Sequence, residues 1–245
     1  MEEIDSVTMD YQDYLSGATK DLFWFKAKNG LIEVLLNKLE FENKLKILNL
    51  GAGTGDDLSI INRFGETYVI DKNQKALDLI PKDRVVEKKL CDACDISYPD
   101  VFFDVVVAFD VLEHIEKDFI ALNEIHRILK PSGFFIFTVP AFNFLFSSHD
   151  RNLNHFRRYN IKMIRNLLSK FHCLDLGFWV CTLFIPLAIQ RLLKRKEAVL
   201  KNPYPRLPKI INGFFYYLLT AENFLIKHGI PLPIGTTIFG IYQKR

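Results

Sequence analysis

The stretch Leu48-Asn49-Leu50-Gly51-Ala52-Gly53-Thr54-Gly55 decides the fold, because a short apolar run ends there in three alternating glycines. Residues 46–50 predict a strand, and residues 57–64 predict the helix that follows the glycines. Glycines between a strand and a helix allow positive φ angles and let a ligand approach the backbone closely. The start of the helix adds free N–H groups at the same place. The pattern predicts a ligand-binding turn, with an ordinary tight turn as the alternative.

The spacing of these glycines excludes two phosphate-binding motifs. No lysine follows as in the GxxxxGK[ST] loop, and the order differs from the GxGxxG dinucleotide fingerprint. Asp56 and Asp57 come directly after Gly55, and two carboxylates would repel a pyrophosphate. We therefore expect a neutral or cationic ligand at this turn.

Strand and helix patterns alternate on both sides of the turn. Further strands are predicted at residues 67–71, 84–89, 103–109, 134–139, 173–181 and 236–242. Helices are predicted at residues 21–39, 74–79, 117–129 and 161–171, and a basic loop is predicted at residues 149–159. This alternation predicts a parallel sheet built from right-handed βαβ units.

Charge is distributed unevenly along the 245 residues. Residues 1–140 hold 16 Lys and Arg against 25 Asp and Glu, whereas residues 141–245 hold 16 against 4. The basic part is also the more aromatic and apolar part. This combination predicts contact with an anionic membrane surface, a phosphorylated substrate or nucleic acid. Nucleic acid ranks last, because the sequence contains no recognised RNA- or DNA-binding module.

Composition and segment lengths limit the class and the location. The chain is 49% hydrophobic and 25% charged, which is typical of a folded globular protein and excludes a disordered or collagen-like chain. No uncharged apolar run reaches the ~18–20 residues of a membrane-spanning helix, and the acidic N-terminus lacks a secretory signal. Four cysteines at irregular spacings indicate a reducing compartment. We therefore expect a cytoplasmic protein, with peripheral contact to the inner membrane face as an extension of that location.

Acidic residues follow the second and third predicted strands. Asp71 ends the strand after the glycine turn, where a carboxylate can accept hydrogen bonds from a ribose diol. Asp92 stands in the loop after the next strand, where it can accept from an adenine amino group. The alternative for Asp71 is a cap for a helix that begins after Asn73.

Together, these segments resemble the class I S-adenosylmethionine (AdoMet)-dependent methyltransferases, in particular the type 11/12-like subgroup. The resemblance is carried by LNLGAGTG (48–55), VID (69–71), CDACDISYPDVFFDVVVAFDVLEHI (91–115) and ILKPSGFFIFTVP (128–140). It implies an α/β fold with a Rossmann-like, seven-stranded, mostly parallel sheet, an antiparallel last strand and helices on both faces. We expect one domain made of an N-terminal helical cover (1–44), an AdoMet-binding core (45–182), a helical insertion (183–232) and the last strand (233–245).

The resemblance also implies which residues hold AdoMet, whose product would be S-adenosylhomocysteine. The glycines would face its methionine part, Asp71 its ribose and Asp92 its adenine amine, while Phe109 and Asp110 would lie near the sulfonium. Asn49 departs from the family, which more often has Asp there, so one charge is missing. The expected cofactor-binding residues are Asn49, Gly51, Ala52, Gly53, Gly55, Asp71, Lys72, Asp92, Ala93, Phe109 and Asp110.

Segments outside this core resemble a narrower subgroup, many of whose members accompany surface-glycan or isoprenoid-lipid pathways. They are FWFKAK (23–28), the loop at 149–159 and PLPIG (231–235). The resemblance implies O-methylation of a lipid-linked or anionic acceptor, with methylation of a soluble small metabolite and an inert AdoMet-binding protein as alternatives. The expected substrate-binding residues are Trp24, Arg157, Arg158 and Tyr159. The two arginines would clamp a phosphate or carboxylate, or else belong to a solvated basic loop.

Histidine is the side chain best suited to take a proton from an acceptor hydroxyl near neutral pH. The candidates for acid/base or positioning roles are His114, His149 and His155. We expect no metal. The alternative is a divalent cation on Asp110, Glu113 and His114, which resemble a metal cluster of some quinone and RNA-ribose O-methyltransferases. Otherwise Glu113 and His114 would cap the next helix.

The insertion at 183–232 joins two apolar helical stretches to a basic linker. It predicts a lid over the substrate, a helical segment with its own small core, or a segment that lies in a membrane interface. In the last case, Arg191, Lys194, Arg195 and Lys196 would meet anionic head groups. The sequence leaves the oligomeric state open.

Overall fold

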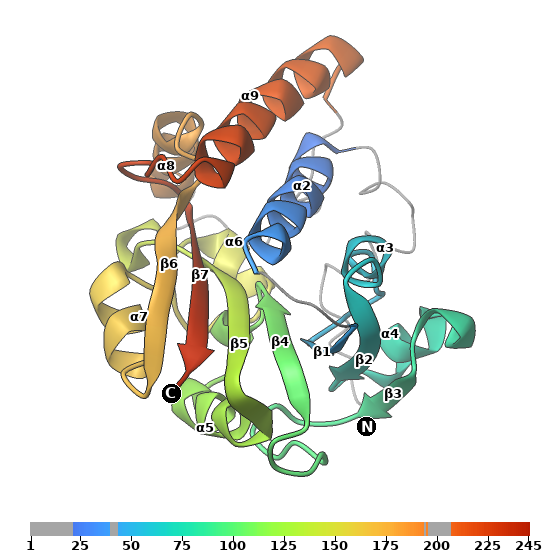
Figure 1. Cartoon of the computed structure of the whole chain (residues 1–245). Helices are drawn as coiled ribbons and strands as arrows, with labels where there is room; N and C mark the ends of the chain where they lie inside the picture. Colours follow the sequence, from blue (N-terminus) through green and yellow to red (C-terminus); the bar gives the residue numbers. More distant parts are fainter. Residues whose placement is uncertain (1–21, 40–43, 194, 196–206) are drawn as a thin grey trace, which may run out of the picture.

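Seven strands form one mixed sheet in the order β3-β2-β1-β4-β5-β7-β6 (Figure 1). The computed structural model describes residues 22–39, 44–193, 195 and 207–245. The strands are β1 (Leu45–Leu50), β2 (Gly65–Asp71), β3 (Glu87–Leu90), β4 (Phe103–Phe109), β5 (Leu129–Pro140), β6 (Phe171–Trp179) and β7 (Thr237–Lys244). The first five run parallel, and β7 lies antiparallel between β5 and β6. The structure confirms the predicted Rossmann-like sheet with its antiparallel last strand.

Helices cover both faces of the sheet (Figure 1). The α-helices are α2 (Phe23–Asn37), α3 (Leu58–Ile61), α4 (Gln74–Leu79), α5 (Asp118–Ile128), α6 (Ser148–Asn152), α7 (Ile161–Leu167), α8 (Phe184–Leu193) and α9 (Lys209–Lys227). Short 3-10 turns are η1 (Lys82–Arg84), η2 (Leu112–His114) and η3 (Asn143–Leu145). Residues of α5 and α7 pack on one face of the sheet, and residues of α2 and α9 pack on the other.

The central strands are buried on both faces, which accounts for their continuous apolar runs. Ile47 and Val105 belong to the core beneath α2 and α9. Their chain neighbours Leu48 and Val106 point the other way, into the core beneath α5 and α7. All four are fully buried, and each such side chain contributes about 1.5–3 kcal/mol to folding. The strands are therefore a rigid support for the loops at their ends.

The N-terminal helix α2 packs closely against α9. Asn223 donates from Nδ2 to the carbonyl of Ala27 at 2.8 Å, and the rings of Phe23 and Phe215 lie 5.2 Å apart. A Cβ at Gly30 would lie 3.0 Å from Asn223 Nδ2. The glycine inside α2 thus allows the close approach of α9, which holds α2 over the sheet.

Two helices are shorter than the sequence predicts. Residues 57–64 are helical only at Leu58–Ile61, and residues 161–171 only at Ile161–Leu167. In both places the next strand begins before the predicted one, at Gly65 for β2 and at Phe171 for β6. Pairing in the sheet therefore outweighs local helix propensity at these ends.

The structure differs from the sequence prediction in two further places. β5 begins directly after α5, so Pro131 and Gly133 lie inside the strand, where Pro131 holds the preceding residue extended. The predicted loop at 149–159 contains α6. This helix begins with a capping box in which Ser147 and Asp150 satisfy each other's backbone N–H groups.

A helix able to cross a membrane would need both length and continuous apolar character, and none in the described part of the chain combines the two. Lys194 and Lys196, which the sequence analysis places against anionic head groups, lie outside the described residues.

Candidate active site

A wide cleft of about 2060 Å³ opens at the carboxyl ends of the parallel strands. The loops after β1, β2, β4 and β5 meet around it, as expected for a sheet of this topology. α2 closes one side, with Trp24 in the lining, and α8 closes another with Pro186 and Arg191. The predicted site residues all line this cleft except for Asn49, Arg157 and Tyr159.

The glycine turn needs its glycines for two different reasons. Gly51 has a φ of +69°, and a Cβ there would lie 2.6 Å from a methyl of Val111. Gly53 has a φ of +52°, and a Cβ there would meet nothing within 4 Å. Gly51 therefore allows tight packing against the turn after β4, whereas Gly53 provides the left-handed conformation beside open space in the cleft.

Asp71 joins the end of β2 to the glycine turn. Its Oδ2 accepts from the backbone N–H of Gly53 at 2.8 Å, and its Oδ1 accepts from that of Asn73 at 2.8 Å. Asn73 itself caps α4, so the capping role considered for Asp71 falls to its neighbour. In the loop after the neighbouring strand β3, the exposed Asp92 accepts from the N–H of Cys94 at 2.7 Å. Both carboxylates border the cleft with lone pairs to spare for a ligand.

Asn49 is buried beside the glycine turn and does not line the cleft, so its contact with a cofactor stays a prediction. Its Nδ2 donates to Asp57 Oδ1 at 2.9 Å. Burial raises the pKa of Asp57 to about 6, although Lys28 and the hydrogen bond from Asn49 act in the opposite direction. Asp57 lines the cleft as its place after the glycine turn predicts, whereas its raised pKa depends on burial that the sequence does not reveal.

Asp110 follows β4 and forms an ion pair with a lysine of α2. It has a φ of +57°, and its Oδ2 lies 2.6 Å from Lys28 Nζ while its Oδ1 accepts from Thr138 Oγ1 at 2.8 Å. Burial alone would raise the pKa of Asp110, but the charge and hydrogen bond of Lys28 outweigh it and the pKa is lowered. Lys28 is a cleft residue that was not predicted. The only signal for it in the sequence is its position in the aromatic and basic segment 23–28.

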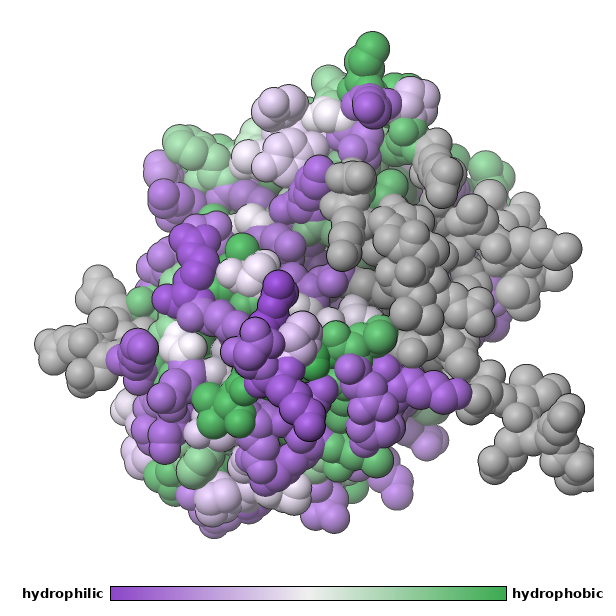
Figure 2. All heavy atoms as spheres, turned by 90° about the vertical axis from the view of Figure 1, so that its right-hand side faces the viewer, coloured by the Kyte–Doolittle hydropathy of each residue, from purple (hydrophilic) through white to green (hydrophobic). Residues whose placement is uncertain are grey.

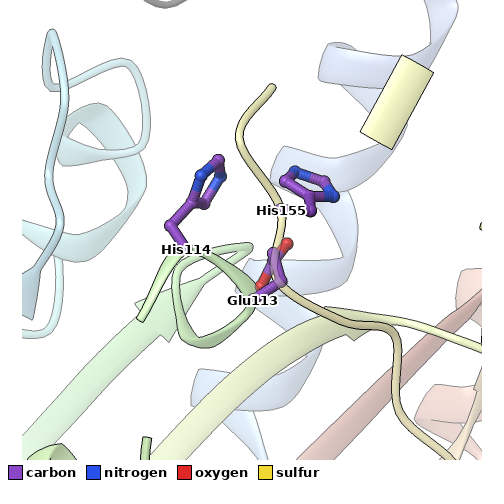
Figure 3. A group of neighbouring side chains, drawn as sticks. All are labelled: Glu113, His114 and His155. Carbon is purple, nitrogen blue, oxygen red and sulfur yellow. The ribbon is translucent and has the colours of Figure 1, made fainter. Parts of the chain in front are cut away.

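Three side chains meet on the far side of Asp110. Glu113 and His114 come from η2, and His155 comes from the segment after α6 (Figure 3). The two imidazole centroids are 4.5 Å apart, and Glu113 is 1% exposed, with no hydrogen-bond partner for Oε2 in the part of the chain that the structure describes. Burial, with the nearby Asp110, raises the pKa of Glu113 well above its usual value. Burial also lowers the pKa of His114 to about 3, so its imidazole is neutral near pH 7.

His155 is held by a buried ion network. Its Nδ1 lies 3.2 Å from Asp150 Oδ1, and the same carboxylate pairs with Arg158 Nε at 2.7 Å and Arg191 Nη1 at 3.1 Å. Burial would raise the pKa of Asp150, but its hydrogen bonds and the two arginines outweigh this and the pKa is lowered. His149 also lines the cleft, and burial together with Arg191 lowers its pKa to about 3.

Three predicted substrate-binding residues have structural partners instead. Arg157 donates to Asp118 at 3.0 Å outside the cleft, and the fully buried hydroxyl of Tyr159 lies 2.9 Å from the same carboxylate. Arg158 borders the cleft, but its Nε bonds Asp150 and its Nη1 bonds the carbonyl of Ala141 at 3.0 Å. Both arginines are thus engaged by partners within the protein, and the arginine clamp stays a prediction. Trp24 does face the cleft.

The residues present suit AdoMet. The turn is open at Gly53, the carboxylates of Asp71 and Asp92 border the same space, and the ring of Phe109 lies in its lining. These groups offer backbone N–H donors, carboxylate acceptors for hydroxyl and amino groups, and an apolar contact. The many carboxylates, Asp110 among them, suit a ligand that carries a positive charge.

Comparison with known proteins agrees with this site. Residues 48–137 match the family model described as a methyltransferase domain. The ubiquinone/menaquinone biosynthesis C-methyltransferase UbiE of Paraburkholderia phymatum is 40% identical in an alignment of 99 positions, which covers 36% of this chain and 40% of that protein. This chain thus spans less than half the length of the curated relatives it matches.

Solved structures share the fold at low sequence identity. A methyltransferase in complex with the Haloferax volcanii Trm112 methyltransferase activator superposes with a TM-score of 0.61 at 16% identity, covering 97% of this chain and 96% of that one. A phosphoethanolamine N-methyltransferase of Haemonchus contortus in complex with AdoMet has a TM-score of 0.58 at 18% identity, covering 88% and 52%. The sheet order and the glycine turn define a Rossmann-like fold of the class I methyltransferases. Over residues 48–137 this chain is similar to the methyltransferase-domain family, and its fold is that of the class I AdoMet-dependent methyltransferases.

Proposed function

We propose that this protein transfers the methyl group of AdoMet to a hydroxyl of a lipid-linked or otherwise anionic acceptor. The observation that carries the choice of acceptor is the position of α8. Pro186 and Leu187, on one face of this helix, line the cleft, whereas Ile185, Ile189 and Leu193 on its other face are 69%, 53% and 78% exposed. An acceptor with an apolar tail could therefore pass along α8 from a membrane surface into the cleft.

The residues that would hold AdoMet are those of the glycine turn and the next two strand ends. They are Gly51, Ala52, Gly53, Gly55, Asp71, Lys72, Asp92, Ala93, Phe109 and Asp110. When bound, AdoMet supplies an electrophilic methyl group on a sulfonium. The Asp71 carboxylate accepts from hydroxyl groups, and the backbone N–H groups of the turn donate to an anionic end.

The acceptor hydroxyl would lie against the cluster of Glu113, His114 and His155. His155 is held in place by Asp150, so its ring presents Nε2 as the available nitrogen. His114 and His149, with their lowered pKa values, are weak bases that serve better to position the acceptor. Alignment of the hydroxyl by fixed groups is the main contribution the protein makes to such a displacement.

The outer faces of α8 and α9 support contact with a membrane surface. On α9, Ile210, Phe214 and Tyr217 recur at helical spacing and are 88%, 58% and 71% exposed. Figure 2 shows hydrophobic residues beside hydrophilic ones at the upper end of the molecule, where Figure 1 places α9. Lys209 and Lys227 lie exposed at the two ends of the same helix. Apolar stripes flanked by lysines are typical of helices that lie in an anionic interface.

A second candidate is methyl transfer to a carbon of an isoprenoid quinone. It is favoured by the similarity to proteins named as ubiquinone/menaquinone C-methyltransferases. The same apolar approach along α8 would serve such a substrate.

The first experiment identifies the acceptor fraction. The protein is incubated with methyl-labelled AdoMet and a cell extract, which is then separated into organic-soluble and aqueous parts. Asp71→Ala, at an AdoMet concentration below its raised Kd, serves as the control of reduced activity. Protein-dependent label in the organic part supports the proposal, and nuclear magnetic resonance of the product separates O- from C-methylation. Label confined to the aqueous part would show a soluble acceptor, and no label in either part would show an inert AdoMet-binding protein.

The second experiment tests the membrane contact by flotation with neutral phosphatidylcholine vesicles and with vesicles that also contain anionic phosphatidylglycerol. We expect salt-sensitive binding to the anionic vesicles, lost in Ile189→Glu and Leu193→Glu. Val86→Glu is the matched control, because Val86 is 54% exposed beside β3, at the opposite edge of the sheet from β6 and α8. Equal binding by all three variants, or no binding by the native protein, would contradict the contact through α8.

A further inference from the structure

The cluster of Glu113, His114 and His155 has the composition of a metal site. One carboxylate oxygen and one ring nitrogen from each histidine lie within 4.8 Å of one another (Figure 3). A backbone hydrogen bond links the two loops that carry them: the N–H of Phe156 donates to the carbonyl of Glu113 at 2.8 Å. The fold therefore brings His155 to Glu113 and His114, although more than forty positions separate them in the chain.

Glu113 provides the independent sign of a missing partner. Its side chain is 1% exposed, and Oε2 has no hydrogen-bond partner among the described residues. A buried carboxylate oxygen without a partner is costly, and native proteins rarely leave one so. Glu113 is also among the residues that line the cleft, so the cluster lies at the wall of that space.

The surroundings of His155 match those of a metal-binding histidine. Its Nδ1 lies 3.2 Å from the buried carboxylate of Asp150, which leaves Nε2 as the coordinating nitrogen. Metal-ligating histidines almost always have such a carboxylate, carbonyl or water at the second ring nitrogen. Asp150 is itself fixed by Arg158 and Arg191, so the ring orientation is set in advance.

The structure corrects the alternative ligand set considered from the sequence, which named Asp110 with Glu113 and His114. Both oxygens of Asp110 are engaged, one by Lys28 at 2.6 Å and the other by Thr138 at 2.8 Å. His155 takes the third position instead.

We infer that Glu113, His114 and His155 bind one divalent transition-metal cation of the Zn²⁺, Fe²⁺ or Mn²⁺ class. Two imidazoles and one carboxylate suit these ions, whereas Mg²⁺ and Ca²⁺ prefer oxygen ligands throughout. Metal–ligand bonds of about 2.0–2.2 Å would draw the three ligand atoms to roughly 3.4 Å from one another, by small side-chain rotations. Three protein ligands leave a coordination position open toward the cleft.

That open position gives the cation a role in the proposed function. A hydroxyl oxygen bound there would have its pKa lowered by the cation, and it would be held in a fixed orientation. This role rests on the proposed methyl transfer, whereas the binding of the cation itself does not.

Metal binding is tested on tag-free, chelator-treated protein titrated with Zn²⁺ and with Mn²⁺ by calorimetry, and with Co²⁺ by visible absorption. We expect one site per chain. Glu113→Gln and His155→Asn should weaken binding about 10- to 100-fold, while His172→Asn, an exposed histidine of β6, should leave it unchanged. Circular dichroism and AdoMet affinity show whether each variant is folded.

The outcomes separate this inference from the proposed function. A single site that is weakened by about 10-fold or more in the two cluster variants and retained in His172→Asn supports it. Binding that is equal in all variants, or absent, overturns it, and methyl transfer that persists in a strong chelator would then leave the proposed function intact. A metal-loaded protein that transfers no methyl group would instead contradict the proposed function.

Discussion

Lys28 Nζ lies 2.6 Å from Asp110 Oδ2, so the N-terminal helix α2 places a cation at the end of β4 inside the cleft. The pair is largely shielded, with side-chain exposures of 18% and 35%. The pair also keeps a protonated lysine in the cleft. The attraction of Asp110 outweighs the effect of burial, so the pKa of Lys28 is raised. The α2 helix is thus part of the site as well as a cover over it.

We expect this ion pair to contribute measurably to stability. A double-mutant cycle with Lys28→Met and Asp110→Asn should give a coupling of about 1–2 kcal/mol in urea unfolding, below that of a fully buried pair. The control is Glu33 with Arg63, which also ties α2 to the rest of the protein at 2.9 Å but is more exposed. Its coupling should be at most about 0.5 kcal/mol. Equal coupling in the two cycles would show that Lys28 and Asp110 do not interact as the geometry implies.

Removal of the Asp71 carboxylate should weaken AdoMet binding. Asp71→Ala loses charge-assisted hydrogen bonds worth about 1.5–3 kcal/mol, so we expect a roughly 10- to 100-fold higher Kd by calorimetry. Asp71→Asn keeps one acceptor oxygen, so its Kd for AdoMet should lie between those of the native protein and Asp71→Ala. Asp78→Ala, an exposed acid on α4, should bind AdoMet like the native protein. Unchanged affinity in Asp71→Ala would place the cofactor elsewhere.

The raised pKa of Asp57 predicts that the stability of the protein depends on pH. Its pKa is raised from 3.8 to about 6 in the folded protein, so the folded state disfavours its ionised form. The native protein should therefore lose stability as the pH rises through this window, whereas Asp57→Asn has nothing to titrate there. Relative to the native protein, the variant should gain roughly 1–2 kcal/mol between pH 4 and pH 7 in urea unfolding. The amide oxygen can still accept from Asn49. A pH-independent difference between the two proteins would contradict the raised pKa.

Arg158 should be a structural residue. In Arg158→Met, the buried carboxylate of Asp150 loses one of its positively charged partners. We therefore expect the free energy of unfolding to fall by roughly 3 kcal/mol. Arg157 is 30% exposed, and its buried partner Asp118 keeps the hydrogen bond from the Tyr159 hydroxyl, so Arg157→Met should cost less, about 1–2 kcal/mol. The two variants are compared by urea unfolding. A larger loss in Arg157→Met would reverse the roles assigned to these neighbours.

The sequence by itself determined the sheet and the place of the cleft. Apolar runs, glycines and helical spacing are local patterns, and the parallel βαβ rule then brings the glycine turn, Asp71 and Asp110 to one edge. Boundaries were less predictable. Residues at the ends of α3 and α7 went to turns and strands, because pairing with a neighbouring strand depends on distant residues.

Only the tertiary structure decided which polar groups meet. Nothing in the local spacing connects Lys28 with Asp110, or His155 with Glu113 and His114, since these contacts depend on how α2 and the segment after α6 pack on the sheet. The same packing buried Arg158 and Tyr159 and turned Asn49 beneath the glycine turn. A sequence shows which residues could take part in chemistry. Whether a side chain faces the cleft or is held within the protein depends on partners contributed by other parts of the chain.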